Sequence, residues 1–174
     1  MSLRDIKRRI RSVKLTKKIT KAIQMVAAAK VKQAQAKALA TRAYREQLLT
    51  MIQNTGMANL KLPATASTLY VYFSSDRGLC GSYNSQLQKF FLKTALETKK
   101  QNRVITIGRK GFQALRSLGF HITASFVGFS DKPRLVDILP VVHMITESLT
   151  TKKISKVVLV YQSFINEAVQ KPSF

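Results

Sequence analysis

MSLRDIKRRIRSVKLTKKITKAIQMVAAAK, residues 1–30, opens a stretch that contains neither proline nor glycine before Gly56. Proline and glycine disfavour a helix interior most strongly, so the stretch predicts a single helix over residues 1–55. Ser2 precedes Asp5 at the spacing of a capping box, which favours a helix start at this point. About 53 helical residues at about 1.5 Å each extend about 80 Å, more than twice the width of a domain of this size. Such a helix cannot be buried within its own chain, so we expect it to lie against another molecule.

The charge of this predicted helix is almost entirely positive. Residues 1–45 contain 14 Lys and Arg residues and one acid, Asp5, whereas the remaining 129 residues contain 16 Lys and Arg residues and 7 acids. Residues 1–45 therefore carry +13 of the net charge of +22. Like charges at helical spacing repel each other by a few tenths of a kcal/mol per pair. We therefore expect the helix to face acidic surfaces.

Apolar side chains form a seam along the helix. The seam has two groups with a shift of register between them: Leu3, Ile6, Ile10 and Val13, and then Ile19, Ile23 and Val26. Eight alanines follow between residues 27 and 43. The shift indicates that the seam drifts around the helix, which argues against a long, regular two-stranded coiled coil. A solvated helix of high propensity is the alternative, but the continuity of the apolar stripe favours burial against a partner.

The chain after residue 55 has a different pattern. Apolar runs of strand length cover 68–74, 103–108, 119–126 and 156–165, and helical patterns cover 87–94, 112–118 and 135–149. This alternation predicts an α/β fold with a mostly parallel sheet and helices on its faces. The first run, TLYVYFS, is apolar on both faces, which is typical of a strand covered on both sides. Pro140 is expected in the first turn of its helix or at a kink. We therefore predict a long helix (1–55), a linker (56–67) and an α/β domain (68–174).

The α/β pattern raises the question of a nucleotide site. Neither GxxxxGK[ST] nor GxGxxG follows any predicted strand. Two shorter pairs of glycines are present, in Gly78-Leu79-Cys80-Gly81 and in Gly108-Arg109-Lys110-Gly111. Either pair could bind a phosphate at a helix N-terminus, but glycines that serve tight strand-to-helix turns are the favoured interpretation.

Catalytic and metal-binding patterns are absent from the sequence. The eight acids are scattered, and Cys80 is a lone cysteine that can build neither a zinc cluster nor an internal disulfide. Cys80 is interpreted as a small loop side chain, with a reactive thiol as the alternative, and one cysteine is typical of a reducing compartment. His121 and His143 are each expected to be partly buried and hydrogen-bonded rather than ligands or bases. We expect no catalytic residue, cofactor or metal.

No run of 18 apolar residues is present, so the sequence predicts no membrane span. The basic, acid-poor N-terminus superficially resembles a mitochondrial targeting segment. We expect it to belong to the mature protein, because the resemblance described next begins at residue 2.

The segment IKRRIRSV–x–x–T–x–KITKA–x–x–MVAAAK strongly resembles the N-terminal helix of the gamma subunit of F-type ATP synthases, the central rotor shaft. SSDRGLCGSYN (residues 74–84) resembles a loop at a strand end in the same family, and VYQSFINEAVQKP (residues 160–172) is a weaker match. The resemblance implies a Rossmann-like domain that holds no catalytic nucleotide. It also implies a non-catalytic subunit that couples proton-driven rotation of a membrane ring to conformational change at the catalytic sites of alpha and beta subunits.

The resemblance also implies positions for partner contacts. Ile23 stands where the family usually has Met, facing an acidic loop of the beta subunits. Lys18, Lys21 and Lys30 are candidate electrostatic partners of the acidic loops, with an ordinary solvated face as the alternative. Arg77 resembles an arginine that reaches a beta-subunit carboxylate, with a role in bracing its own loop as the alternative. The Rossmann-like domain is expected near the epsilon-type subunit and the ring.

The chain ends at Phe174, where the family continues toward a long C-terminal helix that completes the shaft. Three interpretations stay open: a longer form of the protein contains the helix, a second polypeptide supplies it, or the shaft is unusually short. The expected location is the cytoplasmic face of a bacterial inner membrane as a peripheral protein, with the matrix side of a mitochondrial inner membrane as the alternative.

A basic nucleic-acid-binding protein is the competing interpretation, because a chain of net charge +22 binds polyanions nonspecifically. Tyr44 is the first aromatic residue, so the basic stretch lacks stacking side chains. It also lacks a recognisable base-reading motif, so specific recognition of nucleic acid is not expected.

Overall fold

The computed structural model describes residues 2–55, 67–95, 102–129, 134–151, 153–166 and 169–174. Contacts divide the chain into two compact units, residues 1–60 and 61–174. The predicted linker, residues 56–67, lies outside the described residues except for Ser67.

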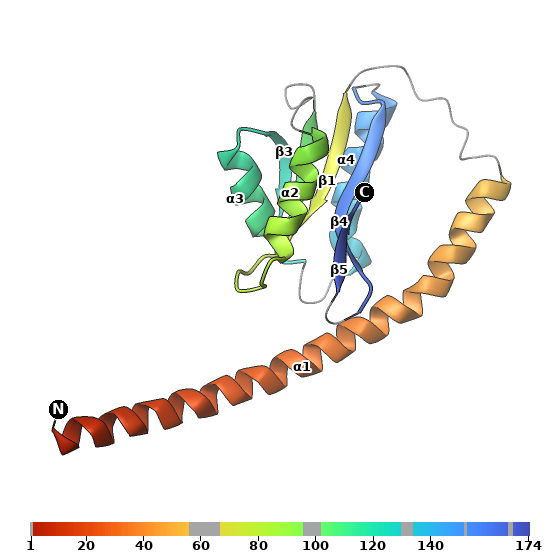
Figure 1. The fold of residues 1–174 in the computed structure, drawn as a ribbon. Coiled ribbons are helices and arrows are strands. Elements are labelled where there is room, and N and C mark those ends of the chain that lie inside the picture. Colours follow the sequence, from red (N-terminus) through yellow and green to blue (C-terminus); the bar gives the residue numbers. More distant parts are fainter. Residues whose placement is uncertain (1, 56–66, 96–101, 130–133, 152, 167–168) are drawn as a thin grey trace. The chain divides into compact units, whose positions relative to one another are not determined.

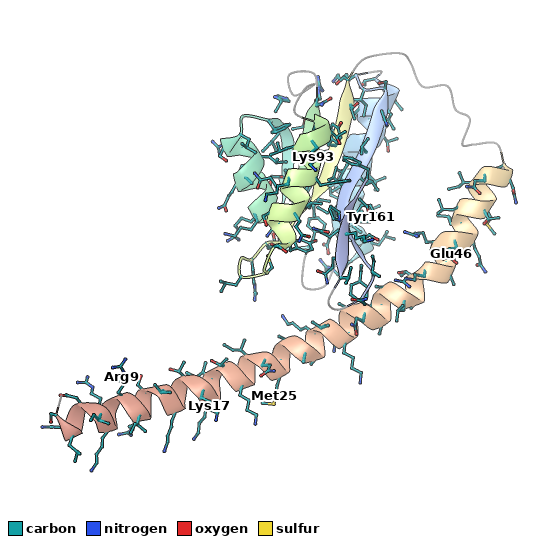
Figure 2. All side chains as sticks on the ribbon, in the orientation of Figure 1. Arg9, Lys17, Met25, Glu46, Lys93 and Tyr161 are labelled. Carbon is teal, nitrogen blue, oxygen red and sulfur yellow. The ribbon has the colours of Figure 1, made fainter. Side chains whose placement is uncertain are left out.

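The first unit is one unbroken helix, α1 (Leu3–Asn54), as predicted from the absence of proline and glycine (Figure 1). Its start is the predicted capping box: the backbone N–H of Ser2 donates to Asp5 Oδ2 at 3.1 Å, and the Ser2 hydroxyl accepts from the backbone N–H of Arg4 at 3.2 Å. No residue of α1 is buried. Figure 2 shows side chains projecting along the whole helix, among them the labelled Arg9, Lys17 and Met25. The helix is therefore held by its own hydrogen bonds and not by packing of a buried face.

The second unit is built on a five-stranded sheet in the order β3-β2-β1-β4-β5. The strands are β1 (Thr68–Phe73), β2 (Arg103–Ile107), β3 (His121–Phe126), β4 (Lys156–Phe164) and β5 (Gln170–Ser173). The first four are mutually parallel, which confirms the predicted α/β fold with a mostly parallel sheet. β5 runs antiparallel to β4 and was not predicted. Its sequence, QKPS, is short, polar and contains proline, a composition that suits only an edge strand.

Helices cover both faces of the sheet (Figure 1). On one face, α2 (Tyr83–Ala95) and α3 (Arg109–Ser117) bury Leu87, Phe91 and Leu115 against the sheet. On the other face, α4 (Leu135–Thr150) buries Val141. The four central residues of β1 are buried, because this strand is covered on both sides as predicted.

The placement of Pro140 differs from one of the two expected positions. Pro140 is the sixth residue of α4 and so lies beyond the first turn, which makes the first-turn placement wrong. Because proline has no N–H, Pro140 cannot donate to the carbonyl of Val136. Packing of Val141, Met144 and Ile145 against the sheet offsets this loss.

Candidate partner-binding site

The predicted contact residues of α1 are exposed but do not form one patch. Lys18, Lys21, Ile23 and Lys30 all lie on the exposed surface of α1. A helix turns by about 100° per residue, which places Lys18 and Lys21 on one side and Ile23 and Lys30 on nearly the opposite side. The four residues can therefore meet partners only on more than one side of the helix.

The seam of α1 is likewise divided between two sides. The same geometry places Leu3, Ile6, Ile10 and Val13 on one side, and Ile19, Ile23 and Val26 on nearly the opposite side. All seven side chains are exposed, with Leu3 71% and Ile23 63% accessible. One straight partner helix cannot cover both groups. The drift predicted from the sequence is thus large enough to separate two apolar strips.

Arg77, the remaining predicted contact residue, lies in the loop between β1 and α2 (residues 74–82), which we call the β1–α2 loop. Its side chain is exposed. The neighbouring Asp76 ties this loop to the segments that follow two other parallel strands, β2 and β3. Asp76 Oδ1 accepts from the N–H of Arg109 at 3.1 Å, and Oδ2 accepts from the N–H of Gly128 at 3.0 Å. The loop that carries Arg77 is therefore anchored to the segments that follow β2 and β3.

The backbone amides at the N-terminus of α3 are not available to bind a phosphate. The first three amides of α3 donate to the protein itself: Arg109 to Asp76, Lys110 to the Ser75 carbonyl at 3.0 Å, and Gly111 to Ser74 Oγ at 2.8 Å. A phosphate at a helix N-terminus needs these donors free. The side chains of Ser74 and Asp76 and the carbonyl of Ser75 thus occupy the position that an anionic ligand would take.

The glycines around α3 serve close packing of the backbone, as the favoured interpretation predicted. Gly108 has φ +103°, and a Cβ at this position would collide with the carbonyl oxygen of Ser74. A Cβ on Gly111 would lie 2.6 Å from Ser74 Oγ and 2.8 Å from the ring of Tyr72. Neither position can accept a larger residue without displacing β1.

Cys80 lies in the β1–α2 loop as an exposed free thiol. Asn84, in the first turn of α2, donates from Nδ2 to Cys80 Sγ at 3.1 Å and to Ser75 Oγ at 2.7 Å. The N–H of Ser75 donates to Asn84 Oδ1 at 3.2 Å. Burial of Tyr83, and to a smaller extent the proximity of Cys80, raises the pKa of the Tyr83 phenol. Asn84 therefore braces both ends of the loop, and Tyr83 remains neutral.

The expectation of partly buried histidines was wrong. His121 and His143 are both exposed. His121 begins β3, an edge strand whose alternate side chains face away from the core. His143 lies on the side of α4 opposite the buried Val141. Among the described residues, no group of three or more His, Cys, Asp and Glu residues is placed to hold a metal ion. No helix in the described part of the chain is long and apolar enough to cross a membrane.

Comparison with known proteins assigns the family. A family model described as ATP synthase matches residues 2–174. An ATP synthase gamma chain of Pelotomaculum thermopropionicum is 32% identical over 178 residues, which cover 98% of this chain and 63% of that relative. The chain belongs to the ATP synthase gamma-chain family. A gamma chain of Xylella fastidiosa gives a similar match, 32% identical over 182 residues. The chain spans about 63% of the length of these curated relatives.

Solved structures agree with this family assignment. A chain in the central stalk and c-ring structure of the Tetrahymena thermophila mitochondrial ATP synthase is 28% identical, with a TM-score of 0.72. The match covers 89% of this chain and 70% of that one. A chain in the rotor of the Euglena gracilis mitochondrial ATP synthase has a TM-score of 0.65 at 18% identity and covers 98% of this chain, which supports the fold alone. The predicted resemblance to gamma subunits is thus confirmed.

One exposed residue of the β1–α2 loop did not attract attention at the level of sequence. Leu79 has φ +58° and a fully exposed side chain. In the sequence it is simply the residue after Gly78 in a glycine-bounded turn, and nothing in that pattern shows that it projects into solvent.

Proposed function

We propose that the chain acts as a central-stalk subunit that couples proton-driven rotation of a membrane ring to conformational change at the catalytic sites of an alpha and beta subunit assembly. The observation that carries this proposal is α1. It has 52 residues, no buried side chain, and apolar strips on nearly opposite sides. A helix that needs cover on several sides is suited to the middle of an assembly. Membership in the gamma-chain family supplies the identity of that assembly.

The chemistry of α1 also suits a contact that turns. A rotating contact must impose a shape on its surroundings without locking to them. Diffuse positive charge and small alanine side chains give weak interactions at many angular positions, whereas large interdigitating side chains would hold one position. We propose that Lys18, Lys21 and Lys30 meet acidic loops of the surrounding subunits, that Ile23 makes an apolar contact there, and that Arg77 meets a beta-subunit carboxylate.

The remaining partners follow from the same proposal. One apolar strip of α1 packs against another helix of the stalk, supplied by a longer form of this chain or by a second polypeptide. The α/β unit lies near the epsilon-type subunit and the membrane ring. The chain is placed at an energy-transducing membrane as a peripheral subunit, on the cytoplasmic side in a bacterium or on the matrix side in a mitochondrion. It contributes no catalytic residue, and the catalytic nucleotides are held by the partners.

Purification from membranes tests the proposal. The tagged chain is recovered from detergent-solubilised membranes of its source, and the intact mass of every accompanying subunit is measured. We expect alpha, beta, epsilon-type and ring subunits. Recovery of nucleic acid alone, after nuclease and salt controls, would overturn the proposal in favour of polyanion binding.

A coupling assay tests the finer part of the proposal. Inverted membrane vesicles that carry Arg77→Gln should hydrolyse ATP but acidify their lumen several-fold less per ATP hydrolysed than vesicles with the unchanged chain. Arg116→Gln, an exposed position in α3, is the matched control. Equal acidification per ATP in all three vesicle preparations would contradict the role of Arg77.

A further inference from the structure

The first turns of α1, residues 3–14, carry an apolar strip on one side. We call Leu3, Ile6, Ile10 and Val13 the first strip. Because a helix turns by about 100° per residue, the first strip falls within an arc of about 80° and extends about 15 Å along the helix. Its side chains are 44% to 71% exposed. A continuous apolar surface of this kind is stabilised when another apolar phase covers it.

Basic side chains border the first strip on both sides. Arg9 lies about 80° from the middle of the strip in one direction, and Lys14 and Lys7 lie about 60° and 80° from it in the other. All three residues are exposed, and Figure 2 labels Arg9. Residues 3–14 contain six Lys and Arg residues and one acid, a net charge of +5. Long basic side chains can lay their methylene stems on an apolar surface while their charged ends reach a polar layer.

The second apolar strip of α1, within residues 19–26, lacks this basic border. Lys17, Lys18 and Lys21 lie within it or just before it in the sequence. All three are more than about 100° around the helix from the middle of the second strip. Lys17 and Lys21 instead continue the side of the first strip beyond residue 14. The combination of an apolar strip with cations along both of its borders therefore belongs to residues 3–14.

We infer that residues 3–14 bind the surface of an anionic lipid bilayer, with the first strip at the boundary between headgroups and acyl chains and Lys7, Arg9 and Lys14 against lipid phosphates. The helix lies in the plane of the surface and does not cross the bilayer. This site goes beyond the proposed function, because it acts in the chain before a stalk partner covers the first strip.

The two parts of the site act together. Each basic residue close to an anionic membrane surface strengthens binding about fivefold, and this attraction falls off within about 8 Å at physiological salt. The apolar strip adds burial among the lipids, as in other amphipathic helices that lie in a membrane interface. Four aliphatic side chains form a short strip, so binding is reversible and depends on anionic lipid.

A lipid surface suits residues 3–14 better than a nucleic acid or a folded protein does. Aliphatic side chains offer nothing to a nucleic acid, and the segment has no aromatic ring for stacking, since Tyr44 is the first aromatic residue. A folded protein would need carboxylates fixed opposite each border of the strip. Lipid headgroups move laterally, so their phosphates can meet Lys7, Arg9 and Lys14 without a matching pattern.

Vesicle binding by the full chain tests the inference. Sedimentation with vesicles of phosphatidylcholine, alone or with about 30% phosphatidylglycerol, should show binding at least about tenfold tighter to the anionic vesicles. The double variant Ile6→Asn with Ile10→Asn should bind the anionic vesicles about tenfold or more weakly than the unchanged chain. Leu48→Asn with Ile52→Asn is the matched control, since this pair is also apolar, exposed and spaced by four residues in α1. It should change the affinity less than about twofold.

A second double variant, Lys7→Gln with Lys14→Gln, tests the basic border without altering the apolar strip. Lysine and glutamine have similar helix propensities, so α1 should keep its helix content in far-ultraviolet circular dichroism. Affinity for the anionic vesicles should fall several-fold at low salt and change little at high salt, because ions screen the attraction. Affinity for the neutral vesicles should not change.

Several outcomes would overturn the inference. Equal binding of the unchanged chain to neutral and anionic vesicles would remove the role of lipid charge. Unchanged binding after Ile6→Asn with Ile10→Asn would assign the attraction to charge alone, and an equal loss in the Leu48 and Ile52 control would remove the assignment to residues 3–14. An equal loss of affinity for single-stranded RNA in the Ile6 and Ile10 variant would assign the strip to nucleic acid. Recovery of the chain without alpha and beta subunits would overturn the proposed function and not this inference, so the two fail separately.

Discussion

The helix α1 and the α/β unit are stabilised in opposite ways. No residue of α1 is buried, whereas fifteen hydrophobic residues are buried among the described residues of the α/β unit, all between Leu69 and Val160. The α/β unit contains its own core and specifies its own packing. α1 is held only by its backbone hydrogen bonds and its cap, and its apolar and charged side chains are exposed. Buried apolar surface is thus concentrated in the α/β unit, whereas α1 exposes its apolar and charged side chains.

Removal of one aromatic ring from each unit tests this difference in stabilisation most directly and should give the largest effect. Phe91 is fully buried and contacts the rings of Tyr70, Tyr72 and Phe120. Phe91→Ala should lower the free energy of unfolding of the α/β unit by about 3–5 kcal/mol. Tyr44 in α1 is 68% exposed, so Tyr44→Ala should change stability by less than about 0.5 kcal/mol.

Denaturant unfolding, followed by near-ultraviolet circular dichroism of the buried aromatic rings, measures both variants. Similar losses for Phe91→Ala and Tyr44→Ala would show that α1 contributes to the same cooperative core, and would contradict the division between the two units.

Two glycines of the α/β unit test how much close backbone packing contributes to its stability. Gly108→Ala introduces both a positive φ of +103° and a collision with Ser74, so it should cost about 2–4 kcal/mol. Gly81 has φ +59° but nothing within 4 Å of an added Cβ. Gly81→Ala should therefore cost only about 1 kcal/mol, the strain alone. Thermal unfolding of the two variants checks the difference, and an equal cost would show that contact with Ser74 is unimportant.

Loss of the Asp137 charge at the start of α4 should give the smallest change in stability, and this change should depend on pH. The side chain of Arg134 donates to Asp137 at the start of α4, from Nε at 3.1 Å and from an Nη at 3.0 Å. The pKa of Asp137 is lowered mainly by hydrogen bonding from the Arg134 side chain, and to a smaller extent by the hydrogen bond from the Arg134 backbone N–H. A carboxyl with a lowered pKa in the folded state stabilises the fold above its unfolded value of about 3.9, and the contribution is lost as the pH falls through the folded pKa.

Asp137→Asn should therefore lower the melting temperature slightly at pH 6, and the difference from the unchanged chain should disappear as the pH falls through the lowered pKa of the Asp137 carboxyl. Melting curves of both proteins between pH 6 and pH 2 measure this. A difference that stays constant over the whole range would show that the charge of Asp137 has no part in it.

The site could be predicted only in part from the sequence. Arg77 was selected because the surrounding SSDRGLCG resembles a family loop, and the structure places it on a braced, exposed loop. Leu79, two residues later, was not singled out, because its positive φ angle and its full exposure are not visible in a residue type. The roles of Lys18, Lys21, Ile23 and Lys30 stay predictions, since those roles depend on surfaces of other subunits.

Residue types and local patterns were enough to predict α1, the order of the parallel strands along the chain, and the family. A long helix needs only local hydrogen bonds, helix-forming residues and a cap, and all of these are local properties of the chain. Buried parallel strands are equally legible because they are continuous apolar runs.

The other features depend on contacts between distant segments of the chain. The addition of β5, the exposure of both histidines and the engagement of the α3 amides by Asp76, Ser75 and Ser74 all depend on which segments meet in space. The amides of Arg109 and Gly128 lie 33 and 52 residues from Asp76 along the chain. Contacts at such separations are set by the packing of the whole sheet. No local pattern in the sequence therefore predicts them.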